Sequence, residues 1–545
     1  MQEQTTAEGL YARRISDRQC YLDEAYRSAT VTIPSIISDD QDIITRTTPV
    51  VLKKPFQSLG ARGVNNLASK LLLTLFPPTM PFMKYVLSGE AKDEATAQGN
   101  EISKLQAALT RREGRLQDEV DIQNLRTKIY VAIRALLISG NSLVYMDPVE
   151  GGMQVFPLNA YTTVRDGSGN LLDCIYVEKM DRSVITDPRV LEILATHPSA
   201  TTSPTSNTDE SEEPVCLYTR ILREGNSYNS WQEVAGVEIP GSRQTWSIKN
   251  SPWLALRYSA IDGEDYGRGF VEEYRGDLTS YEQLSRDTQF ASANAAKVVW
   301  AVNPNSPLRP KKLLDARNGG VISAAEGDVH AIRLDKGADM NFVMAEKNEL
   351  RQALAASFLL NSSFQRQQER VTAEEVRRMA EELEDTLGGV FSLFSVELQM
   401  PVAHLLERHL VKTDSSFKAL PESSVRIGVV TGLAAIGRGQ ELQRMREFLA
   451  LVGDAAQLKP EVVEFLKPAT LITRFVRGSG VESEGLLFTE DEVAANQQAA
   501  QQAAAAQTTG QEMARGAGNA IGNTDPAQMA EMLAAQQEAG GQLPQ

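Results

Sequence analysis

The amino-acid sequence predicts a mixed α+β protein, and three observations lead to that prediction. Apolar residues recur at three- and four-residue steps before residue 140 and again after residue 277, which is the spacing of amphipathic helices. Between about residues 143 and 239 the pattern changes to short β-like runs separated by turn signals. The composition, with 42% hydrophobic and 23% charged residues, is ordinary for a soluble globular protein.

Three amphipathic helices are expected near the N-terminus. The first covers residues 7–29. The second covers residues 59–76 and ends before two prolines, because proline disfavours helix in the residue that precedes it. The third begins at about Leu125 and stops at the signal Ser139-Gly140-Asn141.

The β-rich part is expected to contain the apolar runs LVYM, QVFPL, LLDCIYVEKM and VCLYTRILR. The turn signal at residues 167–170 separates two of them. Residues 198–214 are polar and acidic, so we expect a mobile loop there.

Two further helices are expected on either side of a non-helical segment. The first covers residues 277–301, and small residues in its second half allow close packing against neighbours. Residues 303–341 break the helical pattern with prolines and glycines, and contain the β-like runs GGVIS and DVHAIRL. Helix is expected again over residues 342–360.

The most informative segment is a capped helix, residues 369–401, with two glycines inside its apolar stripe. Thr372 and Glu375 form a capping box at its start. Gly388 and Gly389 interrupt the stripe, where each costs about 1 kcal/mol relative to alanine. Glycines in an otherwise strong helix indicate a kink or a close backbone approach, and we expect a helix kink at this pair.

This helix and the polar segment before it resemble the portal protein, or head-to-tail connector, of short-tailed phages of the podovirus (autographivirus) type. Three more segments carry the resemblance: QSLGARGVNNLASKLLLTLFPP at 57–78, DGEDYGRGFVEEYRGDL at 262–278 and TGLAAIGRGQEL at 431–442. The match is collinear from about residue 5 to about residue 490. The resemblance implies a homododecameric ring at one capsid vertex, through which double-stranded DNA enters and leaves.

The resemblance also implies a phage portal fold with wing, stem, clip and crown regions, a long kinked helix and ring formation. The implied order along this chain is: wing, with N-terminal helices and a β-rich part, 1–276; first stem helix, 277–302; clip, 303–341; second stem helix, 342–360; tunnel loop, 361–370; kinked wing helix and return, 371–430; crown, 431–488; and an Ala/Gln-rich tail or barrel helix, 489–545.

Partners follow from the same resemblance. They are further copies of this chain, the major capsid protein, the terminase large subunit, the tail adaptor protein and internal core or scaffold proteins. Double-stranded DNA would pass through without sequence-specific contacts. The clip would protrude from the capsid and dock the packaging motor, then the tail adaptor. The expected location is a capsid vertex of the virion, after assembly in the host cytoplasm.

A ring of twelve helices leaves room for duplex DNA. Helices packed about 9–10 Å apart trace a circumference of about 110–120 Å, so opposite helix axes lie about 35–38 Å apart. Subtracting one helix width of about 10–12 Å leaves a bore of roughly 25 Å. That bore admits a duplex roughly 20 Å across, since the grooves of B-DNA are of this scale.

The formal net charge of −16 argues against a protein that grips DNA. Non-specific DNA binders gain affinity by neutralising phosphates with lysine and arginine. A conduit has the opposite requirement, because DNA must slide past without binding tightly. By itself the acidity indicates only that the protein is acidic and soluble.

Five polar side chains after the second stem helix are candidates for contact with DNA: Gln365, Arg366, Gln367, Gln368 and Arg370. They resemble the family's tunnel loop, at the constriction of the channel. The arginines would contact phosphates electrostatically, and the glutamines would offer weak, sequence-neutral hydrogen bonds. The alternative is a solvated surface loop that joins two helices.

The clearest basic cluster lies in the segment that the resemblance assigns to the clip. It consists of Arg309, Lys311, Lys312 and Arg317. These cations are candidates for docking acidic patches of a partner, or DNA near the exit. The alternative is a solvated charge run, or salt bridges between subunits.

The sequence holds no catalytic constellation, and we expect no metal site, no cofactor and no enzymatic activity. Neither Gly267-Arg268-Gly269 nor Gly437-Arg438-Gly439 is a GxGxxG motif, and no P-loop sequence occurs, so we expect turn glycines there. The motifs H-E-x-x-H, C-x-x-C and G-x-S-x-G are absent as well. The resemblance places the ATPase that moves DNA in a separate motor protein.

Two functions therefore remain in competition. The first is a portal ring that conducts DNA. The alternative is an internal virion core or scaffold protein, which would build an oligomeric shell without a DNA channel. The Ala/Gln-rich segment 489–545 does not separate them, since it is either a frayed tail or a helical extension inside the head.

Overall fold

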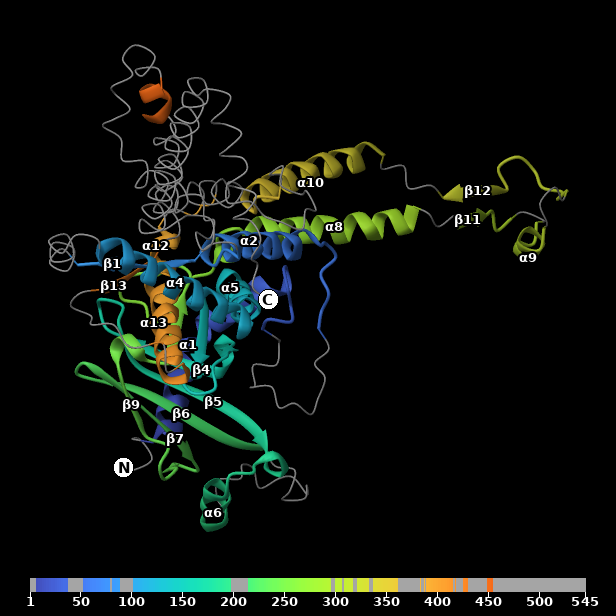
Figure 1. Ribbon diagram of the computed structural model, residues 1–545. Coiled ribbons are helices and arrows are strands. Elements are labelled where there is room, and N and C mark those ends of the chain that lie inside the picture. The colour runs from blue at the N-terminus through green and yellow to red at the C-terminus, as the bar shows by residue number, and fades with distance from the viewer. Residues whose placement is uncertain are drawn as a thin grey trace, which may run out of the picture. The chain divides into compact units, whose positions relative to one another are not determined.

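The computed structural model of this chain describes residues 6–37, 52–78, 81–88, 101–197, 214–295, 299–305, 308–316, 321–332, 337–360, 383, 387, 389–414, 417, 425–429 and 448–453. The chain forms two compact units, Met1–Gly439 and Gln440–Gln545. In the second unit the described residues are 448–453, and they are helical. The helices and strands labelled in Figure 1 belong to the first unit.

Several sequence-based expectations lie outside the described residues. They are the acidic loop apart from Pro214, the capping box at Thr372 and Glu375, most of the expected crown, and the C-terminal segment 489–545.

The N-terminal part is helical. Its helices are α1 (Ala7–Thr30), α2 (Leu59–Leu75), α4 (Glu101–Ile122) and α5 (Leu125–Ser139). Helix α1 begins where the Thr6 hydroxyl accepts a hydrogen bond from the Gly9 N–H. Helix α5 ends at Gly140, whose φ of 73° is the left-handed conformation that closes helices. The three helices expected here are confirmed, and α4 is an additional one.

The β-rich part forms two antiparallel sheets. One has the order β10-β2-β3, from β2 (Asn141–Met146), β3 (Met153–Phe156) and β10 (Trp253–Arg257). The other has the order β4-β5-β6-β7-β8, with β9 also paired to β7; its strands are β4 (Tyr161–Arg165), β5 (Leu171–Asp181), β6 (Pro214–Glu224), β7 (Ser227–Val234), β8 (Val237–Glu238) and β9 (Gln244–Ser247). All four β-like runs expected in this region contain strands.

Short elements and one long-range pair complete this part of the fold. The short elements are η1 (Leu158–Ala160), η2 (Arg182–Val184), α6 (Pro188–Thr196) and η4 (Ile248–Asn250). Strand β1 (Met83–Leu87) pairs with β13 (Val425–Val429), which lies more than three hundred residues later in the chain. This pairing ties the end of the first unit back to its beginning.

A pair of helices leads away from these layers and returns (Figure 1). The elements in chain order are α7 (Phe270–Glu273), α8 (Arg275–Ala295), β11 (Val299–Val302), α9 (Pro310–Leu314), β12 (Val329–Ile332) and α10 (Gly337–Ser357). Helices α8 and α10 pack against each other. Strands β11 and β12 pair antiparallel; β11 comes after α8 in the chain, and β12 comes before α10.

The sequence-based boundaries of these two helices were wrong. Helix α8 ends at Ala295 instead of residue 301, because Val299 and Trp300 favour a strand and pair with Ile332 and Ala331. Helix α10 begins at Gly337, five residues before the expected start. Pairing between distant residues therefore decided the end of α8.

The returning helix reaches the core through an aromatic ring. Phe358 is fully buried and lies 5.3 Å from Phe270, centroid to centroid, in an edge-to-face arrangement. A Cβ atom at Gly63 of α2 would lie only 2.6 Å from the Phe358 ring. The ring therefore occupies the space that a side chain at residue 63 would need.

The last helical segment is irregular. It consists of α12 (Val390–Phe394), the π-helical turn η5 (Ser395–Gln399) and α13 (Met400–Thr413). The Met400 N–H donates to the Ser395 carbonyl, five residues back. Pro401 has no N–H to offer the Glu397 carbonyl, which is a sufficient local reason for this turn to widen.

Replacing Gly63 with alanine should destabilise the fold by about 1–3 kcal/mol, because the new methyl group would collide with the buried Phe358 ring. The free energy of unfolding in urea measures this cost. Gly114 of α4 is the matched control, since a Cβ there meets nothing within 4 Å. Gly114→Ala should leave stability unchanged or raise it by up to about 1 kcal/mol. Equal effects of the two substitutions on the free energy of unfolding would show that the Phe358 ring does not fill the space at residue 63.

Candidate functional site

The far end of the α8–α10 pair carries exposed cations. Arg309 immediately precedes α9, and Lys311 and Lys312 lie within it. All three side chains are exposed, and none forms an ion pair with any residue that the structure describes. Arg317, the fourth predicted member of this cluster, lies outside the described residues. The structure thus brings three of the four predicted docking residues together at the tip.

The predicted tunnel-loop residues 365–368 and 370 all lie outside the described residues. So does Gly388, one of the two glycines at the predicted kink. Gly389 is described and lies in a turn just before α12, where its carbonyl accepts from the Leu393 N–H. The kink at this pair and the role of the loop therefore stay predictions.

The segment that enters the loop is held by α2. Leu359 has a positive φ of 53°, and the Leu359 and Leu360 N–H groups donate to Ala356 and Ala355 carbonyls. This is a Schellman closure of α10 with leucine where glycine is usual. The strained conformation costs about 1–2 kcal/mol in a residue that carries a side chain.

Two polar side chains of α2 satisfy the carbonyl groups at this closure. Asn66 Nδ2 donates to the carbonyls of Phe358 and Leu359, at 3.1 and 3.0 Å. Lys70 Nζ donates to the Leu359 carbonyl at 3.2 Å, although the lysine is only 5% exposed. Sequence reasoning missed both residues. The available signal was weak, because this amphipathic helix also carries other polar residues.

The π-helical turn η5 is held by the same helix and by β10. Gln399 Nε2 donates to the Leu75 carbonyl, at the last residue of α2, with a distance of 2.6 Å. Glu397 accepts hydrogen bonds from the Arg257 N–H, Nε and Nη2. The two side chains are 8% and 16% exposed, so the ion pair is largely shielded from water. Residues 358–360 and 397–399 are thus each fixed to other elements of the fold.

The start of α2 is in turn held by α8. The Glu282 carboxylate accepts from the Phe56 and Gln57 N–H groups, at 2.7 and 3.2 Å. Gln289 Nε2 donates to the Phe56 carbonyl at 3.0 Å. These bonds fix α8 against the chain that leads into α2.

The glycines of the DGEDYGRGF segment allow backbones to approach closely. A Cβ at Gly267 or Gly269 would lie 2.7 Å from the carbonyl oxygen of Gly140 or Ile138. Asn141 bridges to the Gly267 backbone in both directions, at 2.8 Å. These glycines therefore serve packing, as the absence of a phosphate-binding motif predicts.

The arginine between these glycines is tied into a carboxylate network. Arg268 pairs with Glu264 and Glu272, and hydrogen bonding to Glu264 is the main cause that raises the Arg268 pKa. Its guanidinium group lies 4.7 Å from the centre of the Tyr21 ring. Burial, with a contribution from Glu264, raises the pKa of Tyr21 to about 12.

Groups typical of metal sites do not converge in the described part of the chain. No three His, Cys, Asp or Glu side chains there are placed to hold a metal ion. Within the same residues, no helix is both long and apolar enough to cross a lipid bilayer. The three cysteines are free thiols.

Comparison with known proteins decides the family. Residues 4–487 match the family described as bacteriophage head to tail connecting protein. This chain belongs to that family. The portal protein of Enterobacteria phage T3 is 33% identical over 519 residues, which cover 94% of this chain and 93% of the T3 protein. The portal protein of Escherichia phage T7 is 32% identical over 89% of each chain.

A solved structure shows a weaker likeness. A chain from the virion of a native gene transfer agent particle has a TM-score of 0.34 and 11% sequence identity, over 75% of this chain and 87% of that one. A likeness at this level carries no argument about the fold. The role of this family member as a phage portal at the head-to-tail connection accordingly rests on the family match and on its sequence relatives.

Replacing Arg257 with methionine should cost about 3–5 kcal/mol of unfolding free energy, because Glu397 is left buried without its partner. Urea denaturation measures the loss. Replacing both residues with methionine should restore part of it, since no unpaired charge then remains.

A matched control is the exposed pair of Arg243 with Glu238, whose side chains are 51% and 40% exposed. Arg243→Met should cost less than about 1 kcal/mol. A cost for Arg257→Met as small as that of the control would show that the buried pair does not hold the π-helical turn.

Proposed function

We propose that this chain assembles into a dodecameric ring at one capsid vertex and forms the conduit for double-stranded DNA during packaging and ejection. The observation that carries the proposal is the family match over residues 4–487, together with portal relatives that align along most of their length. The alternative, an internal core or scaffold protein without a DNA channel, is not favoured by these relatives.

The α8–α10 pair is the proposed stem, the part of each subunit that lines the channel. Each helix has 21 residues and is therefore about 31 Å long. Twelve such pairs side by side would form a wall of that height. The contact of the Phe358 ring with α2 would set the tilt of each helix pair and so the width of the bore.

The other regions are proposed by the same reasoning. Residues 303–341, at the tip, are the clip, and Arg309, Lys311, Lys312 and Arg317 dock its partners. Residues 361–370 are the tunnel loop, in which Gln365 to Gln368 and Arg370 face DNA. The N-terminal helices, the sheets and the irregular helix form the wing, and residues 431–488 the crown.

The proposed partners divide between the two ends of the ring. The terminase large subunit and the tail adaptor protein bind the clip in turn. The major capsid protein surrounds the wing, and internal core or scaffold proteins bind on the head side. Assembly takes place in the host cytoplasm, and the acidity of the chain lets DNA slide through without tight binding.

The mass of the purified protein tests the ring. Twelve chains of 59.7 kDa should give a particle of about 716 kDa in mass photometry. Image averages of that particle should show an open axial hole. Single chains under every condition, or a particle that is closed along its axis, would refute the conduit.

Replacing Gln365 to Gln368 with alanine should leave ring mass unchanged and impair DNA packaging or retention, because these side chains are proposed to face DNA and not a neighbouring subunit. Complementation of a phage that lacks its own portal gene measures packaged and retained DNA. Wild-type yields of DNA-filled heads would show that these side chains are not needed for DNA packaging or retention.

Reversing the three described tip cations, with Arg309→Glu, Lys311→Glu and Lys312→Glu, should weaken binding of the terminase or the adaptor at least tenfold. The reason is that a rim of cations attracts acidic partner patches. Biolayer interferometry on assembled rings, at two salt concentrations, measures this loss and its salt dependence.

A control for this triple variant reverses three exposed cations on other elements, Arg13, Lys54 and Lys412. It changes the net charge equally and should leave partner binding within about twofold. If both triple variants lose binding to the same extent, net charge and not the tip governs docking.

A further inference from the structure

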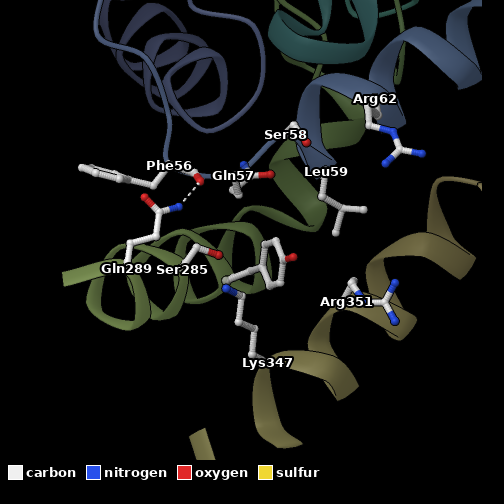
Figure 2. A pocket seen from close by; sticks show the side chains of 10 residues that line it. Phe56, Gln57, Ser58, Leu59, Arg62, Ser285, Gln289, Lys347 and Arg351 are labelled. Atoms are coloured by element: carbon white, nitrogen blue, oxygen red, sulfur yellow. Dashed lines mark hydrogen bonds between the residues drawn. The ribbon is translucent and has the colours of Figure 1, made fainter. Parts of the chain in front are cut away.

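A polar hollow of about 270 Å³ lies where α2, α8 and α10 meet (Figure 2). Figure 2 shows Arg62 extending from α2, Ser285 and Gln289 from α8, and Lys347 and Arg351 from α10. Three of these five side chains are cationic. The hollow has room for the end of an acidic side chain together with several waters.

The cations that line this hollow lack anionic partners within the part of the chain that the structure describes. Arg62 and Arg351 form no ion pair there, and the Lys347 ammonium group lies 5.8 Å from the centre of the Tyr281 ring. The hydroxyl of Ser285, a residue that is only 2% exposed, has no hydrogen-bond partner among the described residues. A buried hydroxyl without a hydrogen-bond partner is destabilising, so the hollow is incomplete as it stands.

The same helix carries carboxylates on its other side. Glu346 and Glu349 of α10 are exposed and form no ion pair with a described residue. At about 100° per residue, the midpoint of these two acids lies about 150° around the helix from the midpoint of Lys347 and Arg351. One helix thus has a basic side at the hollow and an acidic side facing away from it.

The rim of the hollow also has an apolar part suited to an interface. Phe56 and Phe290 are 43% and 52% exposed and lie 6.0 Å apart. The Arg286 guanidinium group lies within 6 Å of both ring centres, at 5.9 and 5.7 Å. Aromatic residues, phenylalanine included, and arginine are enriched in protein interfaces relative to the rest of the surface.

We infer that this hollow receives a carboxylate of a second copy of this chain, supplied by the Glu346–Glu349 side of the next copy's α10. The inference rests on the proposed ring. Subunits in a ring meet head to tail, so each copy must present two different, complementary sides. The basic hollow and the acidic side of α10 are complementary in charge, and the incoming carboxylate accepts the hydrogen bond that the Ser285 hydroxyl lacks.

A charge exchange between two variants tests the contact. Arg351→Glu and Glu349→Arg should each lower the fraction of protein mass in rings at least tenfold, because like charges then meet at every interface. A one-to-one mixture of the two variants should restore rings to within twofold of wild type, since alternating copies pair opposite charges. Mass photometry measures the ring fraction, and thermal melting confirms that each variant stays folded.

Arg13→Glu is the matched control, an equal charge change at an exposed arginine of α1, and should assemble normally. Single variants that assemble like wild type, or a mixture that fails as the single variants do, overturn the inference while the ring stands. Inorganic phosphate bound at the hollow, with no rescue in the mixture, overturns it in favour of a plain anion site. A wild-type protein that forms no rings overturns the proposed function and the inference together.

Ser285→Ala gives a second measurement that does not depend on charge. Removing the unpartnered hydroxyl should leave the melting temperature of unassembled chains unchanged or higher. It should raise the protein concentration needed for half-assembly severalfold, because the carboxylate loses a donor. Unchanged assembly would exclude the hydroxyl from the contact and overturn this part of the inference.

Discussion

The contact of the Phe358 ring with the backbone at Gly63 is the constraint on which the rest of this structure depends. Burying a phenylalanine side chain contributes about 1.5–3 kcal/mol, and here that burial joins the end of the α8–α10 excursion to α2. Because α8 is fixed through Glu282 and α10 through Phe358, both helices are anchored on the same side.

Helix α2 is therefore a common platform. Along its length it provides the space at Gly63, the donors Asn66 and Lys70, and the carbonyl of Leu75. Its partners lie about three hundred residues later in the chain. Bringing such distant segments together costs closure entropy, but that cost grows only slowly with length, so a few well-satisfied contacts suffice. Buried carbonyls at a helix end need donors, and this requirement explains the polar residues on an apolar helix.

A protein that works by geometry needs such rigidity more than it needs reactive groups. In the described part of the chain the shielded pair of Arg257 with Glu397 joins one structural element to another. Three cations at the tip and three beside the hollow next to α2 form no ion pair with any residue that the structure describes. Those are the two places where a portal subunit would meet other molecules: its docking partners at the first, and its neighbour in the ring at the second.

The sequence by itself determined which segments are helices and strands wherever apolar spacing and caps agree, as in α1, α2, α5 and the runs of the two sheets. It also determined the family, because long unusual segments carry that information directly. Only the tertiary structure decided that α8 ends at Ala295, because the strand that replaces its last turns exists through pairing with residues 329–332. The roles of Gly63, Asn66, Lys70 and Ser285 were likewise decided in three dimensions. Each role depends on which atoms from distant parts of the chain lie beside the residue. No local sequence pattern encodes that.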